Sequence, residues 1–180
     1  MSDATRTHDA PFVNPIPLWS ERAGMQPAAA PGFEVPLRFL AGIGAAVVAT
    51  LAMDAVMARR PEGATPPTVA AGVLTDRRPD RAPERLATVV HYLAGGLSGG
   101  LYVWLLYATE AALDVDSAVE TVAAAAVLLV LMVGFFAVVV LPRSRIQPDR
   151  LPAVRRDWTL SAGTYVVVLA PLVALASARL

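Results

Sequence analysis

The chain has 180 residues, 56% of them hydrophobic, with a mean hydropathy of +0.53, which is more apolar surface than a soluble domain of this length usually carries. Fifteen arginines balance fifteen acidic residues, and this zero net charge argues against a nucleic-acid-binding surface. The absence of cysteine excludes disulfides, thiolate nucleophiles and iron–sulfur ligation.

The first segment, residues 1 to about 34, is rich in proline, alanine and polar residues. Its repeated prolines are incompatible with a continuous helix. It also lacks the basic start and apolar centre of a signal peptide. We therefore predict a Pro-rich N-terminal tail, either disordered or lying on the membrane surface.

Four apolar segments follow, at about 35–57, 86–108, 119–141 and 158–178. Each is close to the roughly 20 residues that a helix needs to cross a bilayer. The sequence therefore predicts an all-α, polytopic membrane domain over 35–180, with four transmembrane helices in a compact bundle.

Local signals place several helix ends. Pro66-Pro67 predicts a short helix in the first loop, lying at the membrane interface. Asp116 or Ser117 is expected to cap the third span and Asp157 the fourth, where Pro171 predicts a kink.

The loops predict an orientation. Loops 58–85 and 142–157 are rich in arginine, whereas the loop between them is acidic. The positive-inside rule then predicts a multi-pass protein of the cell membrane with both arginine-rich loops in the cytoplasm and both termini outside. At the outer side we expect Arg38 to be an interfacial anchor and Glu110 a solvated residue.

The arginines of the two basic loops are also candidate contacts for lipid phosphates, because guanidinium groups pair well with phosphate. The candidates are Arg59, Arg60, Arg77, Arg78, Arg143, Arg145, Arg155 and Arg156.

Small residues recur at four-residue intervals in the first two spans, a pattern that lets two helices approach closely. We expect these spans to pack through Gly42, Ala46, Gly95, Gly96, Gly99 and Gly100.

Two ionisable residues lie within the apolar spans. Asp54 is near the end of the first span and His91 near the start of the second, so adjacent antiparallel helices would place both at a similar depth. Intramembrane ionisable residues are costly and are functional candidates, and a His–Asp pair can carry or sense protons. The alternative is that each is satisfied structurally, Asp54 by water or a nearby arginine and His91 by a carbonyl or hydroxyl.

Familiar catalytic patterns are missing: the sequence has no phosphate-binding loop with lysine, no HExxH, no GxSxG and no EF-hand loop. Its two histidines also do not suggest two axial haem ligands, because His8 lies in the polar tail. We predict no catalytic residues, no metal site and no cofactor.

The first span contains the stretch from Gly42 to Ala49-Thr50 and then Met53, the next loop contains Pro66-Pro67, and the second span contains His91, Gly95, Gly99 and Tyr102. In these elements the chain resembles small four-span prokaryotic membrane proteins of unknown function. This resemblance implies the fold and no particular activity.

Three function classes follow. The first is a structural or accessory subunit of a membrane complex, with the lipid bilayer and a larger complex or a homo-oligomer as partners and no nucleic acid. The second is a small transporter or proton-linked carrier that uses Asp54 and His91. The third is a protein or enzyme that binds lipid headgroups.

Overall fold

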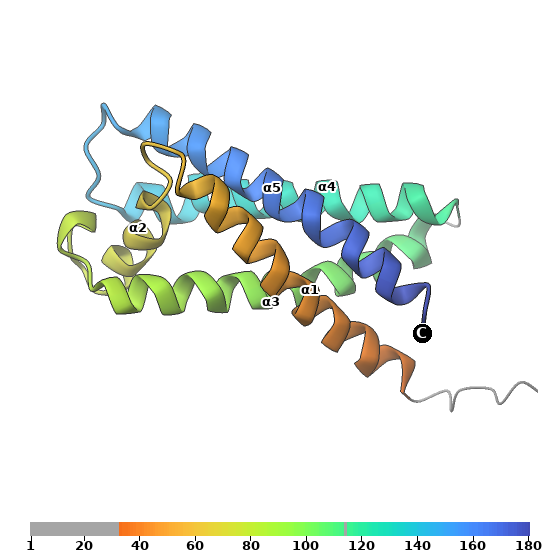
Figure 1. Cartoon of the computed structure of the whole chain (residues 1–180). Helices are drawn as coiled ribbons and strands as arrows, with labels where there is room; N and C mark the ends of the chain where they lie inside the picture. Colours follow the sequence, from red (N-terminus) through yellow and green to blue (C-terminus); the bar gives the residue numbers. More distant parts are fainter. Residues whose placement is uncertain (1–32, 114) are drawn as a thin grey trace, which may run out of the picture. The chain divides into compact units, whose positions relative to one another are not determined.

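The fold is all-helical in a computed structural model that describes residues 33–113 and 115–180. Four helices are long and apolar enough to span a membrane, and they pack together (Figure 1). They are α1 (Glu34–Met57), α3 (Glu84–Leu113), α4 (Ser117–Phe135) with its continuation to Arg143, and α5 (Leu151–Ser177). The predicted fold class is confirmed, whereas the predicted tail lies almost entirely outside the described residues.

Two helices are longer than hydropathy predicts. α3 continues five residues beyond the expected end at 108, and α5 begins at Leu151, seven residues before the expected start. Pro152 stands in the first turn of α5, where its missing N–H costs nothing. Asp157 therefore lies inside α5, and the prediction that it caps this helix is wrong.

The third span starts as predicted and ends irregularly. The Asp116 side chain caps α4 by accepting a hydrogen bond from the N–H of Ala118 at 2.8 Å. After Phe135 the chain forms a π-helical turn over Phe136–Val140 and a 3₁₀ turn over Leu141–Arg143. Pro142 cannot continue the helical ladder, so the span stops there.

The first loop contains the short helix expected after Pro66-Pro67. This is α2 (Thr65–Leu74), and it is followed by a 3₁₀ turn, η2 (Pro79–Arg81). α2 packs against α3 and η2. Its location at the membrane interface stays a prediction.

α1 packs against both α3 and α5, and α4 packs against α3 and α5 (Figure 1). Tyr102 and Tyr165 are completely buried in the core. In contrast, Val130, Val138 and Val167 are each exposed by 70% or more on the outer surface, an arrangement suited to contact with lipid.

α1 and α3 meet at a close crossing that we call the glycine seam. A Cβ atom built on Gly99 would lie 2.5 Å from the Gly42 backbone oxygen and 2.5 Å from the Ala46 Cβ. A Cβ on Gly95 would lie 2.4 Å from the Thr50 hydroxyl oxygen. No side chain fits at these distances, so the glycines set how closely the helices approach. The seam comprises Gly42, Ala46 and Thr50 on α1 and Gly95, Gly99 and Val103 on α3.

The predicted packing role of Gly96 and Gly100 is wrong. Within the described part of the chain, a Cβ on either glycine would meet no atom within 4 Å. Each follows a seam glycine by one residue, and one residue turns a helix by about 100°. Once Gly95 and Gly99 face α1, the neighbouring stripe faces elsewhere.

Candidate functional site

The structure brings Asp54 and His91 together. Nε2 of His91 lies 2.7 Å from one carboxylate oxygen of Asp54, and the Tyr92 hydroxyl donates to the other at 2.7 Å. The His91 side chain is 11% exposed and that of Asp54 is 32% exposed. The carboxylate is thus held on both oxygens, and the sequence analysis missed Tyr92. The proximity of Asp54 and His91 was predicted from their similar depth along the two helices. The contact from Tyr92 was not predicted, because it depends on how α3 is rotated about its axis.

His91 also lines a cleft of about 600 Å³ between the first half of α3 and the second half of α4. Leu97 and Phe135 line it and are 66% and 61% exposed, so the rim lies on the outer surface of the bundle. Pro66, Pro67 and Ala70 of α2 form another part of its wall. The cleft is the site that the sequence analysis did not find, because it forms where two spans diverge.

The lining of the cleft is mostly aliphatic and aromatic. Two of its polar groups are already engaged: the Thr50 hydroxyl donates to the Ala46 carbonyl at 2.8 Å, and the Tyr165 hydroxyl donates to the Gly95 carbonyl at 2.6 Å. Trp158 lines the cleft and packs on Phe136 with ring centroids 4.8 Å apart. The geometry therefore suits a lipophilic molecule better than a hydrated solute.

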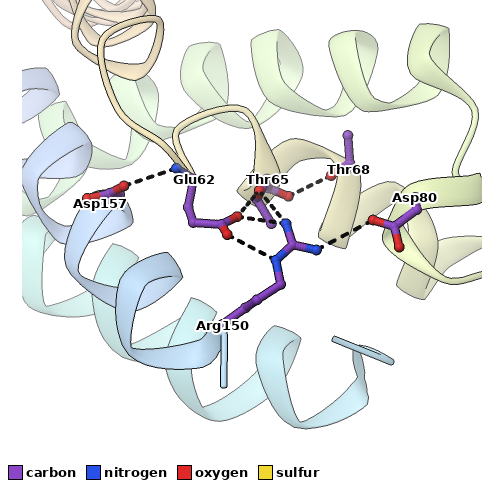
Figure 2. Close-up of polar contacts among 6 residues, drawn as sticks. All are labelled: Glu62, Thr65, Thr68, Asp80, Arg150 and Asp157. Carbon is purple, nitrogen blue, oxygen red and sulfur yellow. Dashed lines mark hydrogen bonds and ion pairs between the residues drawn. The ribbon is translucent and has the colours of Figure 1, made fainter. Parts of the chain in front are cut away.

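Polar contacts fasten the start of α2 to the third loop (Figure 2). Arg150 donates from Nε and Nη2 to the two carboxylate oxygens of Glu62, at 2.9 and 2.8 Å, and its Nη1 lies 3.5 Å from Asp80. The Thr65 hydroxyl also donates to Glu62, at 2.5 Å. The hydrogen bonds from Arg150 lower the pKa of the Glu62 carboxyl, and those to Glu62 raise the pKa of Arg150.

Asp157 reinforces this connection from α5. It is completely buried, and its carboxylate accepts a hydrogen bond from the backbone N–H of Glu62 at 3.1 Å (Figure 2). Nε of Arg156 donates to its other oxygen at 3.1 Å. The side chain that was expected to cap α5 instead holds the loop before α2, and α2 forms part of the cleft wall.

The opposite end of the bundle has its own ion pair. Arg38 donates from Nη1 and Nη2 to Glu110 at 2.9 and 2.5 Å and from Nε to the Ser177 hydroxyl at 2.9 Å. Its guanidinium carbon also lies 4.7 Å from the centre of the Tyr107 ring. Arg38 and Glu110 are therefore partners that join α1, α3 and α5, a pairing that the sequence did not predict. The expected interfacial position of Arg38 stays a prediction.

Only some of the eight candidate phosphate contacts line a common hollow. Arg59 and Arg143 each donate to the carbonyl oxygen four residues earlier, that of Ala55 and that of Val139. Arg156 contacts Asp157, while Arg60 and Arg155 line neither the cleft nor the hollow formed by the other candidates.

The remaining three candidates line one hollow of about 380 Å³, which we call the arginine hollow. Arg145 pairs with Asp76 there at 2.8 Å. Arg81, which was not among the predicted phosphate contacts, completes this group. The hollow is lined by Asp76, Arg77, Arg78, Arg81 and Arg145.

Residues 33–113 and 115–180 contain no group of three or more histidine or acidic side chains arranged to hold a metal ion. Searches of protein-family models, of curated proteins and of solved structures found no significant match to this chain. The four apolar helices suggest a multi-pass membrane protein.

Proposed function

We propose that this protein binds a lipophilic molecule in the cleft between α3 and α4. The observation that carries the proposal is a cleft of about 600 Å³ whose rim, at Leu97 and Phe135, lies on the apolar outer surface. Ligand sites of 300–1,000 Å³ with mostly apolar walls and few polar groups are typical of proteins that bind small molecules. A ligand dissolved in the bilayer can enter such a cleft sideways without passing through water.

The test is a cross-linking experiment on the purified full-length chain in mild detergent. The probe is phosphatidylcholine with a diazirine on one acyl chain, and the sites of attachment are mapped by mass spectrometry. We expect attachment to residues of the cleft and a loss of most of it in Ala94→Trp, which places an indole in the cleft. Leu93→Trp is the matched control, because Leu93 is 59% exposed and does not line the cleft.

Equal labelling of the two tryptophan variants and the original chain would contradict the proposal. Attachment spread evenly over all four long helices would contradict it as well, because a bilayer-like shell of lipid has no preferred site.

A second candidate function is a proton-linked carrier, and the Asp54 cluster favours it. His91 touches both the cleft and Asp54, so it connects a bound molecule to a carboxylate that is partly exposed. Histidine changes its charge near neutral pH, which makes it suited to proton transfer. In proteoliposomes with an internal pH-sensitive dye, we expect Asp54→Asn to abolish proton movement driven by the transported molecule and Tyr92→Phe to slow it.

We further propose that the protein is in the cell membrane with the two arginine-rich loops in the cytoplasm and both termini outside. The excess of arginine in loops 58–85 and 142–157 supports this orientation. The chain has no cysteine, so single cysteines are clean reporters. A cysteine at Arg77 should resist a membrane-impermeant maleimide in intact cells, and one at Leu180 should react.

The hypothesis of an accessory subunit or homo-oligomer stays a prediction. Co-purification in mild detergent followed by mass spectrometry tests it. A stoichiometric second protein would support an accessory role, and a single monomeric species would contradict it.

A further inference from the structure

We propose that the lipophilic molecule is an anionic phospholipid whose phosphate binds in the arginine hollow while an acyl chain occupies the cleft. The inference rests on the function proposed above and names the class of the ligand. Two observations support it. The hollow is lined mostly by arginines, and short stretches of chain connect residues that line the cleft to residues that line the hollow.

The arginine hollow carries an excess of positive charge. Arg77, Arg78, Arg81 and Arg145 contribute four guanidinium groups, and Asp76 contributes one carboxylate. Asp76 pairs with Arg145 at 2.8 Å, so three arginines in the hollow have no carboxylate of the hollow beside them. Guanidinium groups match the geometry of phosphate oxygens and are less strongly hydrated than ammonium groups, so this set suits a phosphate ester.

The backbone at the end of α2 brings the arginines that follow it into the same hollow as Arg145. Asp76 has a φ of 52°, in the left-handed region that non-glycine residues seldom occupy. The N–H of Arg77 donates to the Gly72 carbonyl at 2.9 Å, which closes α2 with a Schellman motif. Gly72 is needed there because a Cβ would lie 2.8 Å from the Arg77 carbonyl oxygen. This ending turns the chain sharply, so that the arginines after α2 share a hollow with Arg145.

Two stretches of chain lead from the cleft to the hollow. In the first, Ala70 of α2 lines the cleft, and Asp76, just after the end of α2, lines the hollow six residues later. In the second, Val140 lines the cleft and Arg145 lines the hollow, five residues later. The α2 segment and the end of the third span thus contribute to both hollows. A phospholipid has the same arrangement, with its phosphate a few bonds from the start of its acyl chains.

The experiment compares two lipids with identical acyl chains, phosphatidylglycerol and phosphatidylcholine, binding to the full-length chain in detergent, with bound lipid counted by native mass spectrometry. We expect phosphatidylglycerol to bind about tenfold more tightly, because its headgroup carries a net negative charge beside the guanidinium groups, whereas the ammonium group of phosphatidylcholine cancels the charge of its phosphate. In Arg77→Gln/Arg78→Gln/Arg81→Gln this preference should fall below about twofold, because phosphatidylglycerol binding weakens more than phosphatidylcholine binding.

Two matched variants sharpen the result. Arg59→Gln/Arg60→Gln/Arg155→Gln removes the same charge from residues that do not line the hollow, and it should keep the preference. Asp76→Asn removes the one carboxylate of the hollow, and asparagine tolerates the left-handed backbone, so this variant should strengthen phosphatidylglycerol binding severalfold.

The outcomes separate the two proposals. Equal binding of the two lipids, or a preference retained in the triple variant of the hollow, overturns the phospholipid inference and leaves the cleft proposal standing. Lipid binding that Ala94→Trp does not reduce overturns the cleft proposal itself. Inorganic phosphate that binds as tightly as phosphatidylglycerol overturns the inference too, because the acyl chain would then add nothing to binding.

Discussion

The two faces of α3 use small residues in opposite ways. Toward α1, Gly95 and Gly99 leave no room for a side chain, and the helices cross at the glycine seam. On the adjacent stripe, Gly96 and Gly100 have open space beside them, and neither lines the cleft between α3 and α4. The comparison teaches that a small-residue pattern predicts close packing only on the face that has a partner helix.

The largest expected effect breaks the seam. Gly99→Leu places a side chain where the Gly42 oxygen would lie 2.5 Å from its Cβ, so α1 and α3 must separate. We expect the free energy of unfolding to fall by about 3 kcal/mol, the upper part of the usual range for overpacking. Thermal unfolding in detergent measures it. Gly44→Leu is the control, because the space beside Gly44 is open and the change should be small; equal losses would contradict the seam.

The next largest effect is expected at the hydrogen bonds between Arg150 of the third loop and Glu62, just before α2. Glu62→Gln removes the charge that Arg150 binds, and we expect a loss of about 2 kcal/mol, as for a hydrogen bond to a charged group. Asp76→Asn breaks a much more exposed pair with Arg145 and should cost under about 1 kcal/mol. Chemical unfolding of both variants at neutral pH gives the comparison.

The same pair predicts how stability depends on pH. Arg150 lowers the pKa of Glu62 in the folded state from its ordinary value of 4.5. The stabilisation is therefore fully present above about pH 4.5 and is lost as the pH falls through the lower folded-state value. Unfolding curves from pH 7 to pH 3 should converge for the original chain and Glu62→Gln. A constant gap between them would show that charge is not the source.

A smaller effect is expected at Asp54 of α1, which His91 and Tyr92 contact. Asp54→Asn weakens the contacts from His91 and Tyr92, and polar contacts between transmembrane helices contribute about 1 kcal/mol each. Tyr92→Phe removes only the more exposed contact and should cost less. Unfolding in detergent ranks the two, and the reverse order would show that Tyr92, not His91, is the main partner of Asp54.

The smallest effect is expected at Gly96, on the stripe of α3 that has open space beside it. Gly96→Ala adds a methyl group that meets no described atom within 4 Å and improves helix propensity, so we expect a gain of up to about 1 kcal/mol. Gly99→Ala, three residues away on the seam, should be destabilising. Opposite signs for the same substitution are the result that the two faces require, and a loss at Gly96 would place it against a partner.

The sequence by itself determined the four long helices, the short helix after Pro66-Pro67 and the cap at Asp116, because these depend on local composition over a few turns. It also brought Asp54 and His91 to one depth, since depth follows from residue count along a helix of known rise.

Only the tertiary structure decided which glycine stripe faces α1, that Asp157 holds a loop, and that α3 and α4 diverge into a cleft. It also joined Arg145 to the arginines after α2. The physical reason is that a helix satisfies its own backbone hydrogen bonds, whereas its rotation and crossing angle are set by side chains of other helices, far away in the sequence.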